Sequence, residues 1–210
     1  MTTQRREHDI KIELTPSGAQ YLGIEMDVCG ERIHFLASSA VGGQFGELVS
    51  ALYALLLENG DSFHPRTQIE TQTDEKHQIL TATARVVWDN EGNLLALSMT
   101  RSVGLAIDLK NDRTELVIRD GLTDALVMSH TLKTQELCYA VAKACTEALK
   151  TYGVYGYRLS TELDTFHLHQ LLYIKALALG DLAARELSSV NGYVWRTSFE
   201  KEMELLMLDM

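Results

Sequence analysis

The segment from Gln44 to Glu58 constrains the fold of this chain more than any other part. Its apolar residues recur at the spacing of one helix face, and they are Phe45, Leu48, Val49, Leu52, Leu55 and Leu56. Asn59-Gly60 follows, as is common where a helix ends. We therefore expect a helix whose apolar stripe covers one face of a sheet.

The segments on both sides of this helix alternate between apolar and polar residues, which is the period of a half-buried strand. Before the helix, the pattern predicts strands over 10–14, 22–28 and 32–36. After it, a polar segment from Arg66 to Thr73 is typical of an edge strand. Further strands are expected over 80–88, 95–99, 103–109 and 115–119, with a short one at 125–129, and Asn90-Glu91-Gly92-Asn93 predicts a tight turn.

From Thr134 onward the period is helical. Helices are expected over 135–152, 164–187 and 198–208, with Gly153 ending the first and Gly180-Asp181 interrupting the second. Separate runs of strands and helices favour an α+β fold, with an antiparallel meander sheet covered by one apolar helix and followed by C-terminal helices. We expect a single α+β domain over residues 1–190, sheet-rich at 10–130 and helical at 134–187, and a C-terminal helical appendage at 191–210.

The composition excludes several classes of function. A formal net charge of −10 disfavours nucleic acid, since that affinity depends largely on cations that neutralise phosphates. No apolar run approaches the roughly 20 residues of a membrane-spanning helix, and the polar N-terminal segment is unlike a secretory signal. Three irregularly spaced cysteines give no disulfide framework and are typical of small core residues in a reducing compartment. We expect a cytoplasmic protein.

Three segments resemble a loose group of uncharacterised bacterial α+β proteins. They are Arg85-Val86-Val87-Trp88-Asp89-Asn90-Glu91-Gly92, Gly42-Gly43-Gln44-Phe45-Gly46-Glu47-Leu48 and Tyr155-Gly156-Tyr157. The plan of that group is a strand meander, a long apolar helix, a hairpin with a tryptophan and an acidic-glycine turn, and a C-terminal helix. The resemblance implies the fold over residues 10 to 180 but no activity and no catalytic residue. Some small acidic α+β proteins of similar outline are immunity proteins that bind and block a toxin.

The residues that carry chemistry do not form a recognisable constellation. His167 and His169 would point about 200° apart on a helix, so we interpret them as polar residues of a first helical turn rather than metal ligands. Gly42-Gly43 precedes a helix, yet neither a Walker loop nor a dinucleotide loop is present. There is no GxSxG, and Cys29 lies among acidic residues that lower thiol reactivity. We expect no catalytic residue, metal site or cofactor.

Two surfaces are candidates for contact with a partner. Tyr152, Tyr155, Tyr157 and Arg158 lie among glycines and have the composition of binding hot spots. The alternative is that these rings close the seam between the C-terminal helices and the sheet. The tail from Phe199 to Met210, with Met203, has an adaptable apolar face. That face would dock on its own domain, pack against a second copy, or receive another protein, in that order of expectation.

The absence of a catalytic constellation favours a non-enzymatic factor that binds another protein, such as an immunity-like or accessory protein. The alternative is a small-molecule-binding protein or an enzyme of unrecorded type. Its pocket would lie between the sheet and the C-terminal helices, with Arg85, Arg101 or Tyr157 as polar contacts. A purely structural homodimer is the third hypothesis.

Overall fold

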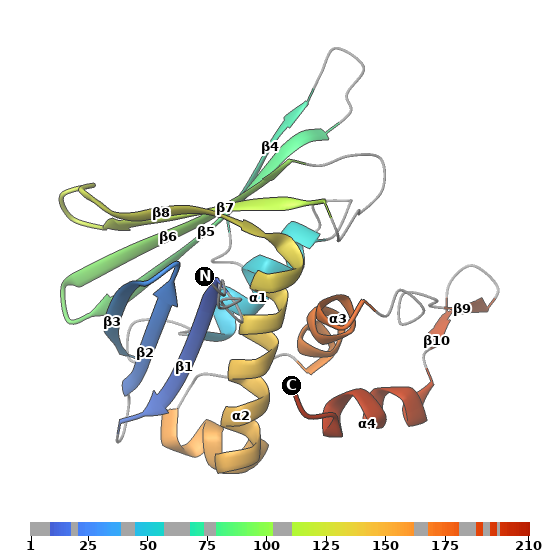
Figure 1. Ribbon diagram of the computed structural model, residues 1–210. Coiled ribbons are helices and arrows are strands. Elements are labelled where there is room, and N and C mark those ends of the chain that lie inside the picture. The colour runs from blue at the N-terminus through green and yellow to red at the C-terminus, as the bar shows by residue number, and fades with distance from the viewer. Residues whose placement is uncertain are drawn as a thin grey trace, which may run out of the picture.

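The arrangement of the chain in space comes from a computed structural model (Figure 1). The structure describes residues 9–17, 21–38, 45–56, 68–73, 79–102, 111–161, 168–180, 188–190, 194–196 and 198–210. Strands, a helix, further strands and then helices follow one another along the chain in the expected order, except that a short hairpin lies between the last two helices.

The strands form antiparallel meanders. The first sheet consists of β1 (Ile10–Pro16), β2 (Tyr21–Val28) and β3 (Glu31–Ser38). The second has five strands in sequence order: β4 (Gln68–Thr73), β5 (Ile79–Asn90), β6 (Asn93–Ser102), β7 (Arg113–Asp120) and β8 (Leu126–Lys133). A separate hairpin joins β9 (Ser188–Val190) to β10 (Val194–Arg196). The α+β class with antiparallel pairing is confirmed, and the strands are divided between two main sheets.

Four helices complete the described part of the chain: α1 (Phe45–Leu56), α2 (Thr134–Thr161), α3 (Leu168–Ala178) and α4 (Phe199–Met207). Gly153 has φ of 68° and ψ of 164°, so α2 consists of two helical sections that meet at a kink. In Figure 1 the short second section turns away below the first. Gly180, with φ of 72°, follows the end of α3. The sequence predicted that the first helix ends at Gly153, but α2 continues beyond the kink to Thr161. Gly180 lies at the predicted break, and the residues after it, 181–187, are outside the described part of the chain.

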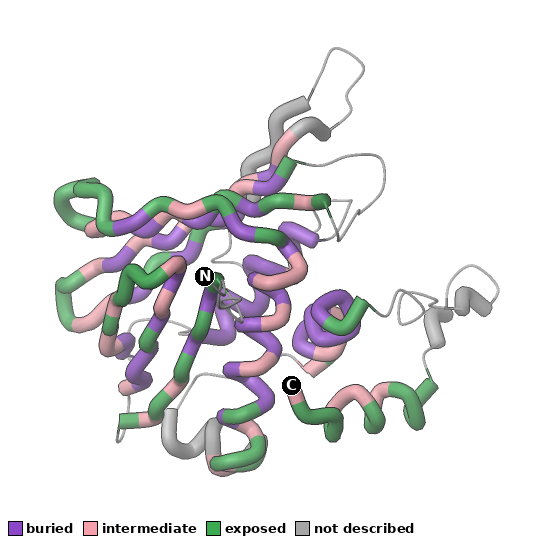
Figure 2. The backbone as a smooth tube through the Cα atoms, viewed as in Figure 1, coloured by how far each residue is buried: buried purple, intermediate pink, exposed green. Residues whose placement is uncertain are grey.

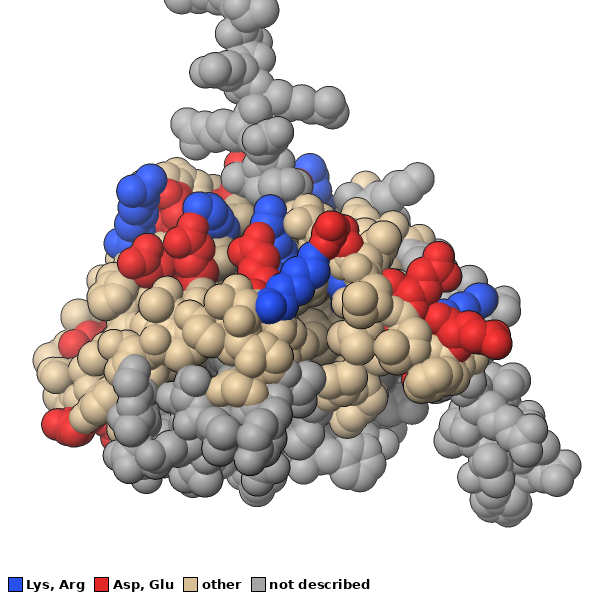
Figure 3. All heavy atoms as spheres, turned by 90° about the horizontal axis from the view of Figure 1, so that it is seen from below, with Lys and Arg blue, Asp and Glu red and all other residues tan. Residues whose placement is uncertain are grey.

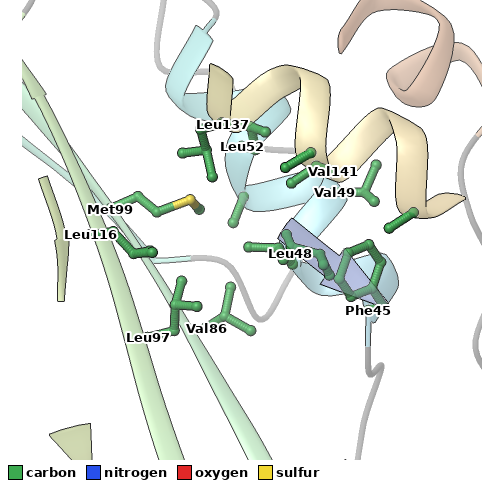
Figure 4. Packing of buried hydrophobic residues seen from close by; sticks show 14 of the residues in the cluster. Phe45, Leu48, Val49, Leu52, Val86, Leu97, Met99, Leu116, Leu137 and Val141 are labelled. Carbon is green, nitrogen blue, oxygen red and sulfur yellow. The ribbon is translucent and has the colours of Figure 1, made fainter. Parts of the chain in front are cut away.

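Helix α1 lies at the centre of the molecule. Every residue of this helix except Tyr53 is buried, so both its apolar stripe and its polar side are removed from water. Figure 4 shows Leu48 among Val86 and Leu97 of the five-stranded sheet, while Leu137 and Val141 of α2 pack from another side. The prediction that α1 covers a sheet is correct, and the structure adds that α2 and α3 enclose it.

Polar residues that enter this core are satisfied by specific partners. The hydroxyl of Ser50 on α1 donates to the Gln170 side chain of α3 at 2.8 Å. Arg101, at the end of β6, is 0% exposed and donates to Asp112 Oδ2 through Nε at 3.2 Å. Its Nη1 lies 3.5 Å from the Leu55 carbonyl oxygen, near the end of α1. A buried ion pair thus ties the β6–β7 connection to the central helix, which avoids an uncompensated buried charge.

The two main sheets meet through side chains of β2, β3, β5 and the β5–β6 turn. The Phe35 and Trp88 rings are stacked, with centroids 6.3 Å apart. The Tyr21 hydroxyl donates to the Glu91 carboxylate. Glu91 and Gly92 both have positive φ, at 52° and 101°, which is the geometry of a two-residue type I′ hairpin turn. The tight turn that the sequence predicted is therefore confirmed.

Other expectations met mixed outcomes. Strand β4 lies at an edge of its sheet, as its polar sequence predicted. Strand β8 runs to Lys133 and is longer than expected, and the β9–β10 hairpin was not predicted. The expected strand at 103–109 and the flanks of α3 at 164–167 and 181–187 lie outside the described residues. Among the helices that are described, none has the length and apolar character needed to cross a bilayer.

Candidate partner-binding surface

Helix α4 is amphipathic but contributes nothing to the interior. Ser198 caps its first turn, since its hydroxyl accepts a hydrogen bond from the Lys201 backbone N–H at 3.4 Å. Glu200 and Glu202 in the first turn match the positive end of the helix dipole. None of the nine residues of α4 is buried. Figure 2 shows the helix as a green and pink arm whose N-terminal half extends beyond the body.

The C-terminal end of α4 is held by a lysine from another helix. Lys175 lies on α3 and is only 1% exposed. Its Nζ donates to the Leu208 carbonyl oxygen at 2.7 Å and to Thr146 Oγ1 at 3.3 Å, and it lies 3.5 Å from the Leu206 carbonyl oxygen. Helix α4 has no basic residue in its own last turn, so Lys175 supplies the positive charge that the end of a helix favours.

Two further contacts fix the residues that follow α4. Asp209 pairs with Lys150 of α2, and Met210 is partly buried against the main core. Burial lowers the pKa of Lys175, and the nearby charge of Lys150 lowers it further. The end of the tail is therefore docked on α2 and α3, while the start of α4 stands away from them (Figure 1).

The outward side of α4 carries three large apolar residues at positions i, i+4 and i+8. Phe199 is 72% exposed, Met203 40% and Met207 71%. Residues at this spacing lie on one side of a helix, within about 80° of one another. We call these three residues the α4 stripe. An exposed apolar stripe is a candidate surface for contact with another molecule.

The acidic residues of α4 differ in exposure. Around the helix, Glu200 follows Met207 by about 20°, and Glu204 continues this exposed acidic edge. On the other side, Glu202 precedes Phe199 by about 60°, is half-buried and is separated from Phe199 by Leu206. Lys201, the single basic residue of the helix, lies on the opposite side. Figure 3 shows acidic side chains gathered at the end of the molecule where α4 lies.

The structure separates the partner-contact residues that the sequence suggested. Phe199 and Met203 share the α4 stripe, with Met207 as an additional member. Tyr152 is half-buried against the main core, at the end of the first α2 section. The backbone of Tyr155, Tyr157 and Arg158 belongs to the second α2 section, but their side chains lie outside the described part of the structure.

The polar groups proposed for a pocket between the sheet and the C-terminal helices are dispersed. Arg85 is exposed on the outer face of β5, whereas Arg101 points to the inner face of β6 and pairs with Asp112. The Tyr157 side chain is outside the described residues. The space between these elements is occupied, in the described part of the chain, by the apolar core.

The other chemical candidates also have defined places. His169 lies in the first turn of α3, as expected, and its ring makes a T-shaped contact with that of Tyr53. His167 falls outside the described residues. Cys138 and Cys145 are buried on α2, and burial raises the pKa of Cys138 to about 12. Gly42-Gly43 is outside the described residues. None of the described residues among these candidates adds a reactive group to the surface of α4.

A shallow concavity of about 370 Å³ lies on the outer face of the β1–β3 sheet. Charged side chains dominate its lining, which comprises Lys11, Glu13, Glu25, Met26, Asp27, Arg32, Ile33 and His34. Opposite charges are already paired here, since Lys11 contacts Glu13 and Arg32 Nε lies 2.7 Å from Asp27 Oδ2. The pairing lowers the pKa of the Asp27 carboxyl group. This arrangement is that of a solvated sheet face.

Sequence reasoning identified the apolar face of the tail but missed the residue that positions it. Lys175 is the signal that was overlooked, because a single lysine lies in the apolar run from Leu171 to Ala178. A lysine in such a run must either reach water or find buried acceptors. No protein-family model, no curated protein and no solved structure matches this chain.

Proposed function

We propose that this protein is a non-enzymatic cytoplasmic factor that acts by binding another protein, in the manner of an immunity or accessory protein, and that the α4 stripe is its docking surface. One observation carries the proposal. Helix α4 is attached at its C-terminal end by Lys175, yet more than two thirds of the surface of Phe199 and of Met207 is exposed to solvent.

The exposure of these side chains has a physical cost that binding would remove. Each large apolar side chain gains roughly 1.5–3 kcal/mol when it leaves water completely. Helix α4 leaves most of that gain unused, since none of its residues is buried and Phe199 and Met207 are largely exposed. An amphipathic helix with anchors one turn apart is a common element of protein recognition, and methionine adapts to the shape of a partner.

Two alternatives have less support. A small-molecule site between the sheets and helices would need convergent polar groups, whereas Arg85 and Arg101 lie on opposite faces of the five-stranded sheet. Enzymatic chemistry would need an accessible nucleophile or acid–base pair. The buried thiols of Cys138 and Cys145 are unsuited to that role, because burial disfavours the thiolate.

In-cell photo-crosslinking tests the proposal. A photoreactive amino acid is placed at Phe199 or Met207, and in control variants at Leu126 or Val127, which are 58% and 43% exposed on β8. We expect one heteromeric adduct from the α4 positions that the β8 positions do not give. After identification by mass spectrometry, the purified partner should bind the full chain directly. Adducts only with a second copy, or the same adducts from all four positions, would overturn the proposal.

A further inference from the structure

The charges around the α4 stripe restrict what can occupy it. Glu200 and Glu204 form the exposed edge of the stripe, whereas on the other side Leu206 lies between Phe199 and the half-buried Glu202. The exposed edge is therefore acidic, while Lys201 is on the side away from the stripe. Any molecule that covers Phe199 and Met207 must bring its own flanking groups close to these carboxylates.

A second copy of the chain is a poor occupant. In a two-fold symmetric contact the same patch meets itself, so one stripe would face another. An antiparallel pair of stripes would place Glu200 and Glu204 of one copy against the same carboxylates of the other. Like charges brought together at an interface cost binding energy. The overall net charge of −10 adds to this repulsion.

We propose that the α4 stripe receives an amphipathic helix of another protein, in which lysine or arginine residues flank the apolar side chains. This inference rests on the function proposed above and names the chemistry of the partner. The stripe extends about 12 Å from Phe199 to Met207, so apolar residues over two to three turns of the partner helix would cover it. Cationic side chains beside those residues would meet Glu200 and Glu204.

The test uses a synthetic helical peptide of about 18 residues, with leucine on one face and lysine on the other, long enough to form a helix in solution. A matched peptide has glutamate in place of lysine. Binding of each peptide to the full chain is measured by fluorescence anisotropy. We expect the lysine peptide to bind and the glutamate peptide not to bind, and we expect binding to weaken as salt is raised.

Two variants with the same change in net charge distinguish two explanations for peptide binding. One is specific binding at α4, and the other is non-specific attraction of a cationic peptide to an acidic protein. The double substitution E200K/E204K reverses one edge of the stripe. The control E25K/E115K reverses two exposed carboxylates on the β-sheets. We expect E200K/E204K to lower the affinity for the lysine peptide at least about tenfold. E25K/E115K should change that affinity less than about threefold. Equal weakening by both variants, or none by either, would overturn the inference.

The outcome is distinguishable from failure of the proposed function. If crosslinking at Phe199 identifies a partner but the lysine peptide shows no dependence on Glu200 and Glu204, the protein-binding function stands and the cationic helix is wrong. If F199S/M203S/M207S binds the lysine peptide as tightly as the wild-type chain does, the peptide binds elsewhere and the inference is also wrong. Circular dichroism of each variant establishes that the sheets and helices remain folded.

Discussion

The ammonium group of Lys175 lies 2.7 Å from the carbonyl oxygen of Leu208, so a buried residue of α3 holds the end of α4. The contact is polar and local, and it leaves the other end of the helix to solvent. This geometry explains how α4 can be fixed in position while its apolar side is exposed. Lys175 is therefore the residue at which a substitution should loosen α4.

Substitution of Lys175 by methionine should loosen α4 selectively. Methionine keeps an apolar stem of similar length but removes the hydrogen bonds to Leu208 and Thr146. We expect hydrogen exchange of the amides of α4 to accelerate about tenfold, while global stability changes by about 1 kcal/mol. The control is K143M, which removes a half-buried lysine of α2. Unchanged exchange in α4 of the K175M variant would contradict the assigned role.

The lowered pKa of Lys175 predicts a pH dependence with a definite sign. Its pKa in the folded protein is below the ordinary lysine value of 10.5, so over the intervening pH range the unfolded chain binds more protons than the folded chain does. Stability from this group should therefore rise as the pH increases from the folded pKa toward 10.5. Urea unfolding of the wild-type chain and of K175M at several pH values measures this contribution. As the pH rises, the unfolding free energy of the wild type should increase relative to that of K175M. A difference that stays constant or decreases would refute the assignment.

The buried ion pair between Arg101 and Asp112 should be a major support of the fold. Replacing Asp112 by asparagine leaves the guanidinium charge buried without its counter-charge, and we expect a loss of about 3 kcal/mol. The exposed pair of Arg119 and Asp124, 3.8 Å apart, gives a matched control. D124N should cost less than about 1 kcal/mol. Urea denaturation of both variants decides the point, because similar costs would mean that burial of Arg101 is unimportant.

Because α1 lies at the centre of the core, shortening the Leu48 side chain should lower the free energy of unfolding substantially. Leu48 is 1% exposed, and shortening it to alanine removes apolar contacts and leaves a cavity. We expect L48A to lower the unfolding free energy by about 3 kcal/mol. Val87 lies on the outer face of β5 and is 51% exposed, so V87A should cost less than about 0.5 kcal/mol. If thermal or urea unfolding gave the two variants equal stability, α1 would not be the centre of the core.

Much of this fold was predictable because local patterns and burial agree. The alternation around Glu25 and Asp27 predicts β2, and the stripe from Phe45 to Leu56 predicts α1, since each pattern has the period of its element. The division into two sheets was not predictable. Pairing between distant strands depends on tertiary packing, such as the stacking of Phe35 on Trp88, which no local period encodes.

The candidate site was only partly predictable for a related reason. The spacing of Phe199 and Met203 predicts an apolar helix face, but the sequence favoured docking of that face on its own domain. Whether such a face is buried depends on how α4 is attached to the rest of the chain. The attachment is the contact of Lys175 with Leu208, which joins residues 33 positions apart. The short β9–β10 hairpin was missed because each of its strands has only three residues, too few to establish a period.

The most direct test of the central claim is the affinity of the partner identified by crosslinking for the full chain with Phe199, Met203 and Met207 all changed to serine. The matched control is L126S/V127S, which removes exposed apolar residues from β8. We predict that the first variant loses affinity at least about a hundredfold and that the second binds as the wild type does. Equal affinity of the wild-type chain and the triple variant, measured by calorimetry on folded proteins, would contradict the claim that α4 is the docking surface.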